Sequence, residues 1–550
     1  MKKVKTGFLG NGFLEKKYKQ KIKSGQKFCY KNSKFIKKDF VLQLIETVLF
    51  SGDRVCLEGN NQKQADFFAK ELTKLNPKKV NNLHLVQSSI VLPEHIQILK
   101  SGIVSKIDFS YSGPQAKPLA EIIKSRKVEL GAIHTYIELY ARYFIDLTPN
   151  VSFIVAESAD KEGNLFFGNN SEDTPVIVEA TKSKFGIVVA QVCKIVNKLP
   201  RVDIPKDYVD FIIETGEKYY IQPLFTRDPA KITKEQIFMA MLVLKGIYLP
   251  YKVKTLNHGI GNATAAIELI LPTYGKKLGL KGKYATHWVL NPHPTLIPAI
   301  EEGFVKNIYS FGGEPGMEDY IKFRKEIFCV GQDGTLKSNR LYAHLAGLYG
   351  IDMFIGSTLQ IDQFGNSSAA TFGRIAGFGG APNLGSTPPG RRHLSESFSM
   401  CKDKKVRYSL GRKLVVQITP TITSKGIPVF VEELDAVKFY KEKILPYVPI
   451  MIYSDQITHL VTEQGIACLY KCDTEQERQL AVSSVAGDTV VGKKVSLQEK
   501  TFLRQKGIFI SPQDLGIKFD DATENLLSAK SFDELVKISK GHYHPVVVSD

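Results

Sequence analysis

A glycine-rich loop at residues 373–385 holds the residue types best suited to acyl-transfer chemistry. It reads GRIAGFGGAPNLG. Successive glycines let backbone N–H groups converge on an anion, and converging N–H groups are what the oxyanion of an acyl-transfer intermediate requires. We therefore predict that Gly377, Gly379 and Gly380 are catalytic. The alternative is a mobile or tightly packed loop, because the spacing fits neither a dinucleotide fingerprint nor a Walker loop.

A second glycine turn, NHGIGN at residues 257–262, lies between an apolar stretch and a helix-like pattern. This order predicts a strand, a tight turn and a helix N-terminus, which favours an anionic group. The predicted binding residues are Asn257, Gly259, Gly261 and Asn262. The similar stretch EGNN, which contains Asn60, predicts a second such turn. His258 is interpreted as a structural histidine.

Two arginines follow the glycine-rich loop in the stretch PPGRRH. A guanidinium beside an acyl-transfer loop binds a carboxylate or a phosphate well. Arg391 and Arg392 are therefore candidates for holding a free carboxylate, and a solvated basic turn is the alternative.

The histidines do not predict a metal site. His287 and His293 are six residues apart with no acid or cysteine in the same stretch, and His542 and His544 have still less support. No Gly-x-Ser-x-Gly elbow occurs, so a serine triad is not indicated either.

The elements around these motifs alternate between short β-branched runs and helix-like stretches. Such alternation predicts an α/β fold with mostly parallel sheets and helices on their faces. In open sheets of this kind, ligands bind in a crevice at the carboxyl ends of the strands.

The sequence also contains an internal duplication. Gly59 and Gly261 lie in similar stretches 202 residues apart, and so do Asp160 and Asp362, each in an Asp-x-x-Gly-Asn turn after an apolar run. A third pair, GIVSKIDFSYSG and GFVKNIYSFGG, recurs in the same order at nearly the same offset. Three matches in order predict two homologous open α/β halves. We place the first at residues 40–230 and the second at 231–550, where it includes the glycine-rich loop and a closing segment.

Lysine is concentrated at the start of the chain. Residues 1–38 hold thirteen lysines, no arginine and a single acid, and they supply most of the net charge of +18. A lysine tail with few aromatics is typical of a solvated or partner-docking arm. We therefore expect an arm over residues 1–39 and no nucleic-acid partner.

The composition excludes several other classes of protein. The chain has 550 residues and seven scattered cysteines with no CxxC pair, which suits a reducing compartment rather than a disulfide scaffold. No run reaches the ~18 apolar residues of a membrane helix, and no signal peptide is apparent. We expect a cytoplasmic protein without a membrane span.

Long stretches resemble one known family. HGIGNATAAIELILPTYGKKLGL, HPTLIPAIEEGFVKNIYSFGGEPGMEDY, FIGSTLQIDQFGNSSAATFGRIAGFGGAPNLG and GRRH in the second half resemble the α subunit of bacterial malonate decarboxylase, as do RVCLEGNNQKQADFFAKEL and PRVDIPKDYVDFI in the first. The resemblance runs from about residue 40 to about residue 510. Gly356, in the third of these stretches, joins the predicted binding residues.

The resemblance implies an acyl-carrier-protein transferase of coenzyme A-transferase fold, with its site between the halves. It would convert acetyl-S-carrier and malonate into malonyl-S-carrier and acetate. The implied partners are an acyl-carrier subunit, which bears a phosphoribosyl-dephospho-coenzyme A arm, and decarboxylase subunits. No cofactor would be bound permanently, and coenzyme A thioesters would be possible surrogate substrates.

One departure from related enzymes concerns the nucleophile. Coenzyme A-transferases that form an enzyme-bound thioester use a glutamate, but the stretch THWVLNPHP, where one would be expected, holds no acid. Glu268, Glu314 and Glu463 are the alternatives by motif. We prefer direct attack by the substrate carboxylate, as the citrate lyase α subunit is thought to use.

Two other functions stay open on the sequence alone. The first is a citrate lyase α-type enzyme or a free acyl-coenzyme A:carboxylate transferase. The second is a catalytically idle scaffold whose basic arm recruits a carrier protein.

Overall fold

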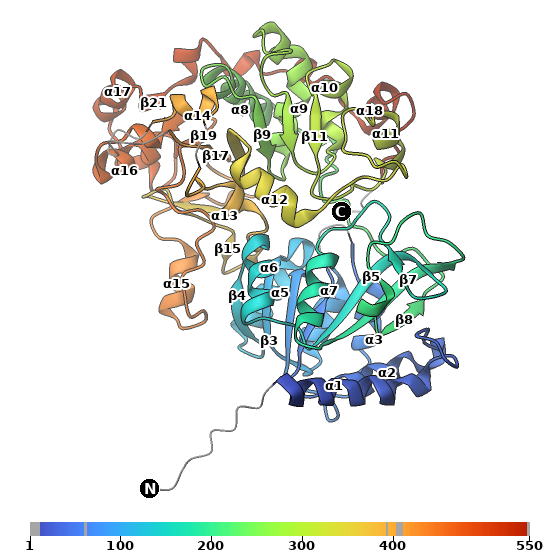
Figure 1. Cartoon of the computed structure of the whole chain (residues 1–550). Helices are drawn as coiled ribbons and strands as arrows, with labels where there is room; N and C mark the ends of the chain where they lie inside the picture. Colours follow the sequence, from blue (N-terminus) through green and yellow to red (C-terminus); the bar gives the residue numbers. More distant parts are fainter. Residues whose placement is uncertain (1–10, 60–62, 392–393, 403–410, 547–550) are drawn as a thin grey trace. The chain divides into compact units, whose positions relative to one another are not determined.

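The computed structural model describes residues 11–59, 63–391, 394–402 and 411–546, and it divides into two compact units, residues 1–221 and 222–550 (Figure 1). Each unit has its own parallel sheet. In the part of the chain that is described, no helix has both the length and the apolar composition that crossing a membrane demands. All seven cysteines are free thiols.

The sheet of the first unit has the strand order β4-β3-β2-β1-β5-β7-β8, with β6 antiparallel to β5 and the other neighbours parallel. Its strands are β1 Arg54–Leu57, β2 Leu83–Ser89, β3 Val104–Tyr111, β4 Glu129–Ile133, β5 Val151–Asp160, β6 Leu165–Phe166, β7 Ile187–Val196 and β8 Phe211–Glu214. The central strand β5 is buried along most of its length, as expected for a parallel strand covered on both faces.

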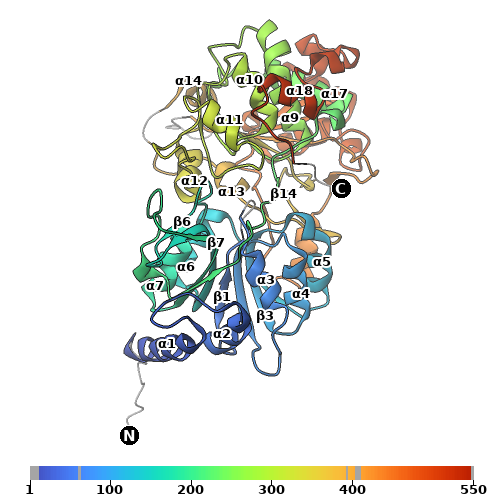
Figure 2. The ribbon, with the colours of Figure 1, turned by 90° about the vertical axis from the view of Figure 1, so that its right-hand side faces the viewer.

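Helices cover both faces of this sheet. They are α1 Asn11–Gly25, α2 Val41–Val48, α3 Asp66–Leu72, α4 Pro93–Lys100, α5 Ala116–Lys124, α6 Tyr136–Ile145 and α7 Thr174–Ser183. Figure 2 shows α6 and α7 on one face and α3, α4 and α5 on the other. Helix α6 begins where the Thr135 hydroxyl accepts a hydrogen bond from Glu138 N, a typical N-cap.

From residue 15 onward, the lysine-rich start of the chain is packed on one side, while most of its lysines stay exposed. Tyr18 is 2% exposed, and Lys21 is 4% exposed with its Nζ 3.2 Å from Asp53 Oδ2. Helix α1 packs against α2. The expected arm over residues 1–39 is therefore corrected for its described part, because one face of α1 contributes to the core of the first unit.

The sheet of the second unit has the order β11-β10-β9-β12-β17-β19-β20-β21 and is parallel from β11 to β19. Its strands are β9 Thr255–His258, β10 His287–Val289, β11 Asn307–Tyr309, β12 Met353–Gly356, β17 Leu414–Ile418, β19 His459–Thr462, β20 Gly465–Cys468 and β21 Phe509–Ile510. The smaller sheets use β13 Gln360–Asp362, β14 Ser367–Ser368, β15 Ala370–Thr371, β16 Arg374–Ile375 and β18 Phe430–Val431.

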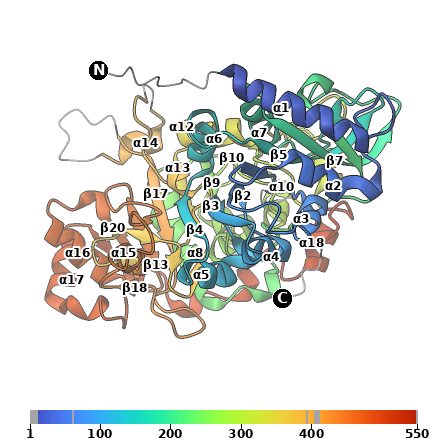
Figure 3. The ribbon, with the colours of Figure 1, turned by 90° about the horizontal axis from the view of Figure 1, so that it is seen from below.

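The helices of the second unit are α8 Lys234–Val243, α9 Asn262–Ile270, α10 Ile297–Glu301, α11 Glu318–Phe323, α12 Arg340–Tyr349, α13 Ala381–Leu384, α14 Glu396–Met400, α15 Asp435–Lys441, α16 Glu475–Ser484, α17 Leu497–Gln505 and α18 Phe532–Ile538. Helices α8 and α9 are deeply buried: residues 237–243 of α8 and 263–270 of α9 are all buried. Helices α16 and α17 lie side by side next to β20 (Figure 3).

The closing segment packs back onto the second unit. Ser528 N donates to Leu269 O on α9 at 3.0 Å, and its hydroxyl donates to the same carbonyl at 2.6 Å. Helix α18 packs on α10. The segment therefore covers two helices that belong to a much earlier part of the chain.

The internal duplication is visible in both topology and hydrogen bonds. In the first unit β1 lies between β2 and β5, and in the second β9 lies between β10 and β12. Asp160 Oδ1 accepts from Asn164 N at 2.9 Å, and Asp362 Oδ1 accepts from Asn366 N at the same distance. In each turn the asparagine amide also donates to the other carboxylate oxygen. The predicted α/β class with two similar, mostly parallel halves is confirmed.

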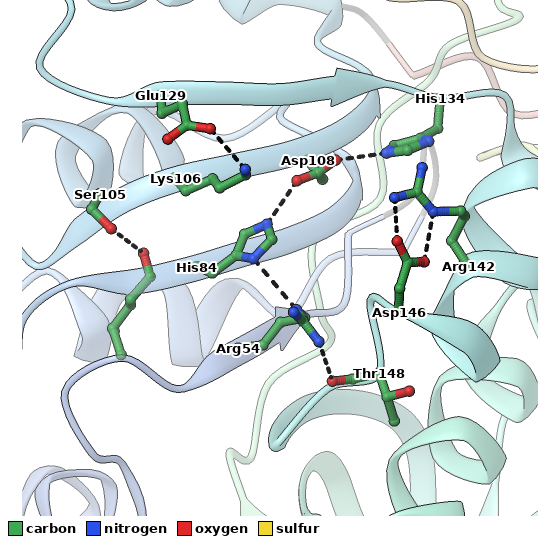
Figure 4. Close-up of polar contacts among 11 residues, drawn as sticks. Arg54, His84, Ser105, Lys106, Asp108, Glu129, His134, Arg142, Asp146 and Thr148 are labelled. Carbon is green, nitrogen blue, oxygen red and sulfur yellow. Dashed lines mark hydrogen bonds and ion pairs between the residues drawn. The ribbon is translucent and has the colours of Figure 1, made fainter.

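The first unit carries a polar network on its sheet, centred on the buried carboxylate of Asp108 (Figure 4). His84 Nε2 and His134 Nε2 each lie 2.7 Å from one of its oxygens. Position 131 on the neighbouring strand has to be glycine, because a Cβ there would lie 2.1 Å from Asp108 Oδ2. Burial alone would raise the pKa of Asp108, but the two histidines outweigh it and hold this pKa well below the usual carboxyl range.

Candidate functional site

The turn that follows β9 brings two predicted glycines together. Gly259 N donates to Ile355 O at 2.7 Å, which ties the end of β9 to β12. A Cβ on Gly259 would lie 3.1 Å from Gly356 Cα, so a side chain at position 259 would crowd the end of β12. Gly261 has a φ of +148°, which also favours glycine. This turn is therefore a close-packed structure at the carboxyl end of the sheet.

Helix α9 starts directly after this turn, at Asn262. The Thr264 hydroxyl lies 2.8 Å from Gly259 O and 2.9 Å from Gly261 O and donates to these carbonyls. The turn residues are half-buried, so a ligand can reach them. An anionic group at this position would face the positive end of the α9 dipole.

Asn257 has a different place from the rest of the turn. It is 2% exposed, and its Nδ2 donates to Val289 O on β10 at 2.5 Å. The side-chain amide therefore joins two neighbouring strands. This contact makes Asn257 a residue that positions the turn, and its predicted role in binding stays a prediction.

A small pocket lies against the turn. It is lined by Phe225, Arg227, Gly259, Ile260, Gly261, Thr264, Ala265, Glu268, His293 and Thr295. Arg227 is half-buried, and its Nη1 donates to Thr226 O at 2.7 Å. Sequence reasoning missed Arg227, because it lies more than thirty residues before the turn and has no motif of its own.

The carboxylate of Glu268 lies at the base of this pocket and is fully buried. His258 Nδ1 and His293 Nδ1 lie 2.9 and 2.8 Å from Glu268 Oε1, and the Thr295 hydroxyl donates to Oε2. Burial by itself would raise the pKa of Glu268, but His293 and His258 outweigh it and keep this pKa far below the usual range. Glu268 is thus an ionised carboxylate with both oxygens engaged.

The two histidines beside Glu268 differ in their second nitrogen. His258 Nε2 is hydrogen-bonded to the Tyr248 hydroxyl, and burial lowers the pKa of His258, so this histidine is neutral and held from both sides. That is the structural position expected from the sequence. His293 Nε2 is buried without a hydrogen-bond partner among the described residues, and its ring stacks on Phe225 at 4.8 Å. His293 is therefore the pocket histidine with a nitrogen left for a substrate.

The glycine-rich loop leads into α13 and packs against α12. Gly377 and Gly379 have φ values of +79° and +56°, which glycine adopts most easily. A Cβ on Gly380 would lie 2.3 Å from His344 Cε1, and the His344 ring packs on Phe311 at 4.4 Å. Phe311 follows β11, so these contacts place Gly380 at the same end of the sheet as the Gly259 turn. The role of this loop as an oxyanion donor stays a prediction.

Arg391 does not lie with the turn. Its Nη1 lies 3.5 Å from Ile351 O, just before β12 begins, and its guanidinium packs on the Phe398 ring at 3.7 Å. Gly356 ends the same strand, about 16 Å further on at ~3.3 Å per residue. The predicted role of Arg391 in holding a carboxylate stays a prediction. Asn60 and Arg392 lie outside the described residues.

The other two candidate glutamates are also engaged by the fold. Glu314 Oε1 accepts hydrogen bonds from Phe225 N at 3.0 Å and Thr226 N at 2.9 Å. Glu463 accepts from Thr421 N at 3.1 Å and from the Thr421 hydroxyl. Both carboxylates therefore serve as local anchors of loops. The Glu314 contacts also explain why residues 222–230 belong to the second unit and not, as expected, to the first.

Comparison with known proteins gives consistent matches. Residues 13–548 match the family described as "Malonate decarboxylase, alpha subunit, transporter". The chain is 54% identical over 509 residues to the Malonomonas rubra protein named acetyl-S-ACP:malonate ACP transferase. The aligned region covers 91% of this chain and 92% of that protein.

Comparison with solved structures points to the same family. The crystal structure of a Pseudomonas malonate decarboxylase hetero-tetramer with malonate matches with a TM-score of 0.94 and 47% identity, over 97% of this chain and 98% of the other. The α subunit of citrate lyase from Streptococcus mutans matches with a TM-score of 0.58 and 15% identity, over 94% and 88% of the two chains. An Escherichia coli acyl-CoA transferase gives a TM-score of 0.51 at 14% identity, over 78% and 87%. The last two likenesses concern the fold alone.

Proposed function

Because the chain belongs to the family of malonate decarboxylase α subunits, we propose that it converts acetyl-S-carrier and malonate into malonyl-S-carrier and acetate. The observation that carries this proposal is the 54% identity, over nearly the full length of both chains, to a protein named for this transfer. The citrate lyase-type alternative has support from fold likeness alone.

The exchange proceeds by direct carboxylate attack. A malonate oxygen attacks the acetyl carbonyl carbon, and the tetrahedral oxyanion collapses with departure of the carrier thiolate. The thiolate then attacks the malonyl carbonyl of the mixed anhydride, and acetate leaves with the bridging oxygen. The exchange requires no net proton transfer. The protein's main tasks are therefore to position the two partners and to stabilise the oxyanions.

The residues at the Gly259 turn suit these tasks. The N-terminus of α9 and the guanidinium of Arg227 attract the carboxylate. His293 donates through Nδ1 to Glu268, which leaves Nε2 as an acceptor for a hydrogen bond from the incoming carrier arm. Gly377, Gly379 and Gly380 remain the proposed N–H donors of the glycine-rich loop. Glu268 orients His293 and does not act as a nucleophile, since both of its oxygens already accept hydrogen bonds.

The proposed partners follow from the same reaction. The acyl group would arrive on a carrier subunit through a phosphoribosyl-dephospho-coenzyme A arm, and decarboxylase subunits would consume the malonyl thioester. Coenzyme A thioesters would serve as surrogate substrates, and the reaction would take place in the cytoplasm.

Intact-mass spectrometry of the carrier tests the reaction. After incubation of acetyl-carrier with the full chain and malonate, the carrier should gain the mass of one CO₂, and replacing malonate by acetate should leave its mass unchanged. An unchanged carrier mass with malonate, or exchange with citrate instead, would contradict the proposal.

Oxygen labelling tests the route. With enzyme in excess and ¹⁸O-labelled malonate, direct attack sends one ¹⁸O into the acetate released in the first turnover. A glutamyl intermediate would instead release unlabelled acetate and leave the label on the enzyme. Unlabelled acetate, or a labelled peptide that contains Glu268, Glu314 or Glu463, would replace direct attack by the covalent route.

A further inference from the structure

A second ligand-sized hollow lies at the opposite end of the second unit's sheet, where β9, β10 and β11 begin. Its volume is about 580 Å³, which is within the range of small-molecule sites. The lining residues are Lys252, Lys254, Thr255, Gly282, Lys283, Tyr284, Thr286, His287, Lys306 and Glu396. None of them belongs to the pocket beside Gly259, from which the length of β9 separates the hollow by about 13 Å.

The sheet register places two of these lysines on either side of one threonine. Thr286 N donates to Lys254 O at 3.0 Å, and Lys306 N donates to Thr286 O at 2.8 Å. Adjacent strands are about 4.8 Å apart, so the two lysine backbones are about 10 Å apart. Both side chains are exposed at the mouth of the hollow. The flexible lysine side chains are long enough to converge across this gap on a ligand of two linked oxyanions.

The charge of the lining is unbalanced. Lys252 Nζ lies 2.6 Å from Glu396 Oε1, and Glu396 is the one acid among the described lining residues. Lys254, Lys283 and Lys306 therefore add three positive charges that this glutamate does not neutralise. Like charges gathered in one hollow repel each other, and a multiply charged anion would relieve that repulsion.

We propose that this hollow binds a small molecule that carries a pyrophosphate group. A terminal pyrophosphate group carries about three negative charges at neutral pH, which matches the three unneutralised lysines, whereas a single carboxylate does not. Lysine ammonium groups are strong donors to phosphate oxygens, and the hydroxyls of Thr255 and Tyr284 add further hydrogen-bonding groups to the wall.

Calorimetric titration of the full chain with inorganic pyrophosphate tests the site. Binding should be seen at low ionic strength and should weaken as NaCl is added, because exposed charges are screened. The double variant Lys254→Gln, Lys306→Gln should bind about a hundredfold more weakly, at about tenfold for each charge-assisted contact. The matched control Lys425→Gln, Lys493→Gln removes two exposed lysines elsewhere and should bind as the unchanged protein does.

Three results would overturn the proposal: absence of pyrophosphate binding at low salt, equal weakening in the control variant, or binding of polyglutamate but not of pyrophosphate. The last would make the hollow a docking surface for an acidic protein. Lys283→Gln, also a lining variant, should give an intermediate loss, and thermal unfolding of each variant verifies that the fold is kept. Since the readout is binding, the result does not depend on the acyl-transfer reaction.

Discussion

At the scale of single residues, the chain fixes the charge state of buried carboxylates through paired histidines. Glu268 lies between His258 and His293, and Asp108 lies between His84 and His134. Each pair holds a charge in a place where burial alone would discharge it. The two carboxylates differ in use, since Glu268 reaches a pocket beside a glycine turn and Asp108 braces a sheet.

The Asp108 network predicts a pH-dependent stability. The pKa of Asp108 is lowered in the folded state, so its contribution is present above about pH 4 and is lost as the pH falls further. Burial opposes charging of His134, but hydrogen bonds to Asp108 and Glu138 outweigh it and raise the pKa of His134. The contribution of His134 to the free energy of unfolding is therefore full below about pH 6.5, and it is lost as the pH rises through the pKa of the folded state.

The variant Asp108→Asn should therefore lose most stability between these limits. We expect a loss of about 3–5 kcal/mol in the free energy of unfolding near pH 6, because two histidines lose a buried charged partner. Urea unfolding from pH 3 to pH 9 should show this difference shrinking at both ends. A difference that stays constant over the whole range would contradict the assignment.

Residue types near one another in sequence predicted the glycine turn, but they did not predict the pocket beside it. Gly259 and Gly261 could be found because a strand, a turn and a helix follow one another locally. Arg391 follows the glycine-rich loop by only a few residues, yet the chain carries it to the amino end of β12. Arg227 and His293 reach the pocket from distant segments, which no local pattern reveals.

At the scale of elements, the end of β9 meets the end of β12 through glycine against glycine. This contact lets both strands finish at the same level and lets α9 start immediately. Alternation of strand-like and helix-like runs could predict these elements. It could not predict how α12 and α13 support the glycine-rich loop, because α13 is short and its position depends on His344 and Leu384 packing on distant residues.

Alanine substitutions at two glycines test whether the close approach of β9 to β12 contributes to stability. Gly259→Ala should cost about 1–3 kcal/mol of unfolding free energy, because the new Cβ pushes β9 away from β12, and should also slow the acyl exchange. Gly373→Ala is the matched control, since a Cβ there meets nothing within 4 Å; it should stay within about 0.5 kcal/mol. Equal effects in denaturant melts would show that the approach of the two strands does not matter.

At the scale of the whole molecule, duplication has preserved a turn while its surroundings changed. Asp160 and Asp362 make the same hydrogen bonds in the two units, but Asp362 is buried and Asp160 is half-buried. The repeat could be predicted because glycines and capping residues recur at one offset. The lysine-rich start misled the prediction, since composition does not show that Tyr18 and Lys21 face a core.

The pKa values of the two turn aspartates, Asp160 and Asp362, should be shifted in opposite directions. Burial raises the pKa of both aspartates, and the turn's hydrogen bonds lower it; the hydrogen bonds win for Asp160 and burial wins for Asp362. Carboxyl ¹³C shifts of aspartate-labelled protein, assigned with Asp160→Asn and Asp362→Asn, should place the pKa of Asp160 below 3.8 and that of Asp362 above it. The reverse order would show that hydrogen bonding rather than burial differs between the units.

The contact between Ser528 and Leu269 has a consequence for biosynthesis. The two residues are 259 positions apart, so at about 5–20 residues per second α9 lacks its contact with the closing segment for roughly 13–50 seconds of synthesis. During that interval the surfaces of α9 and α10 that the closing segment covers are open to chaperones and to neighbouring nascent chains. Slow translation of the intervening region would lengthen this exposure and lower the yield of folded protein, without any change in the finished molecule.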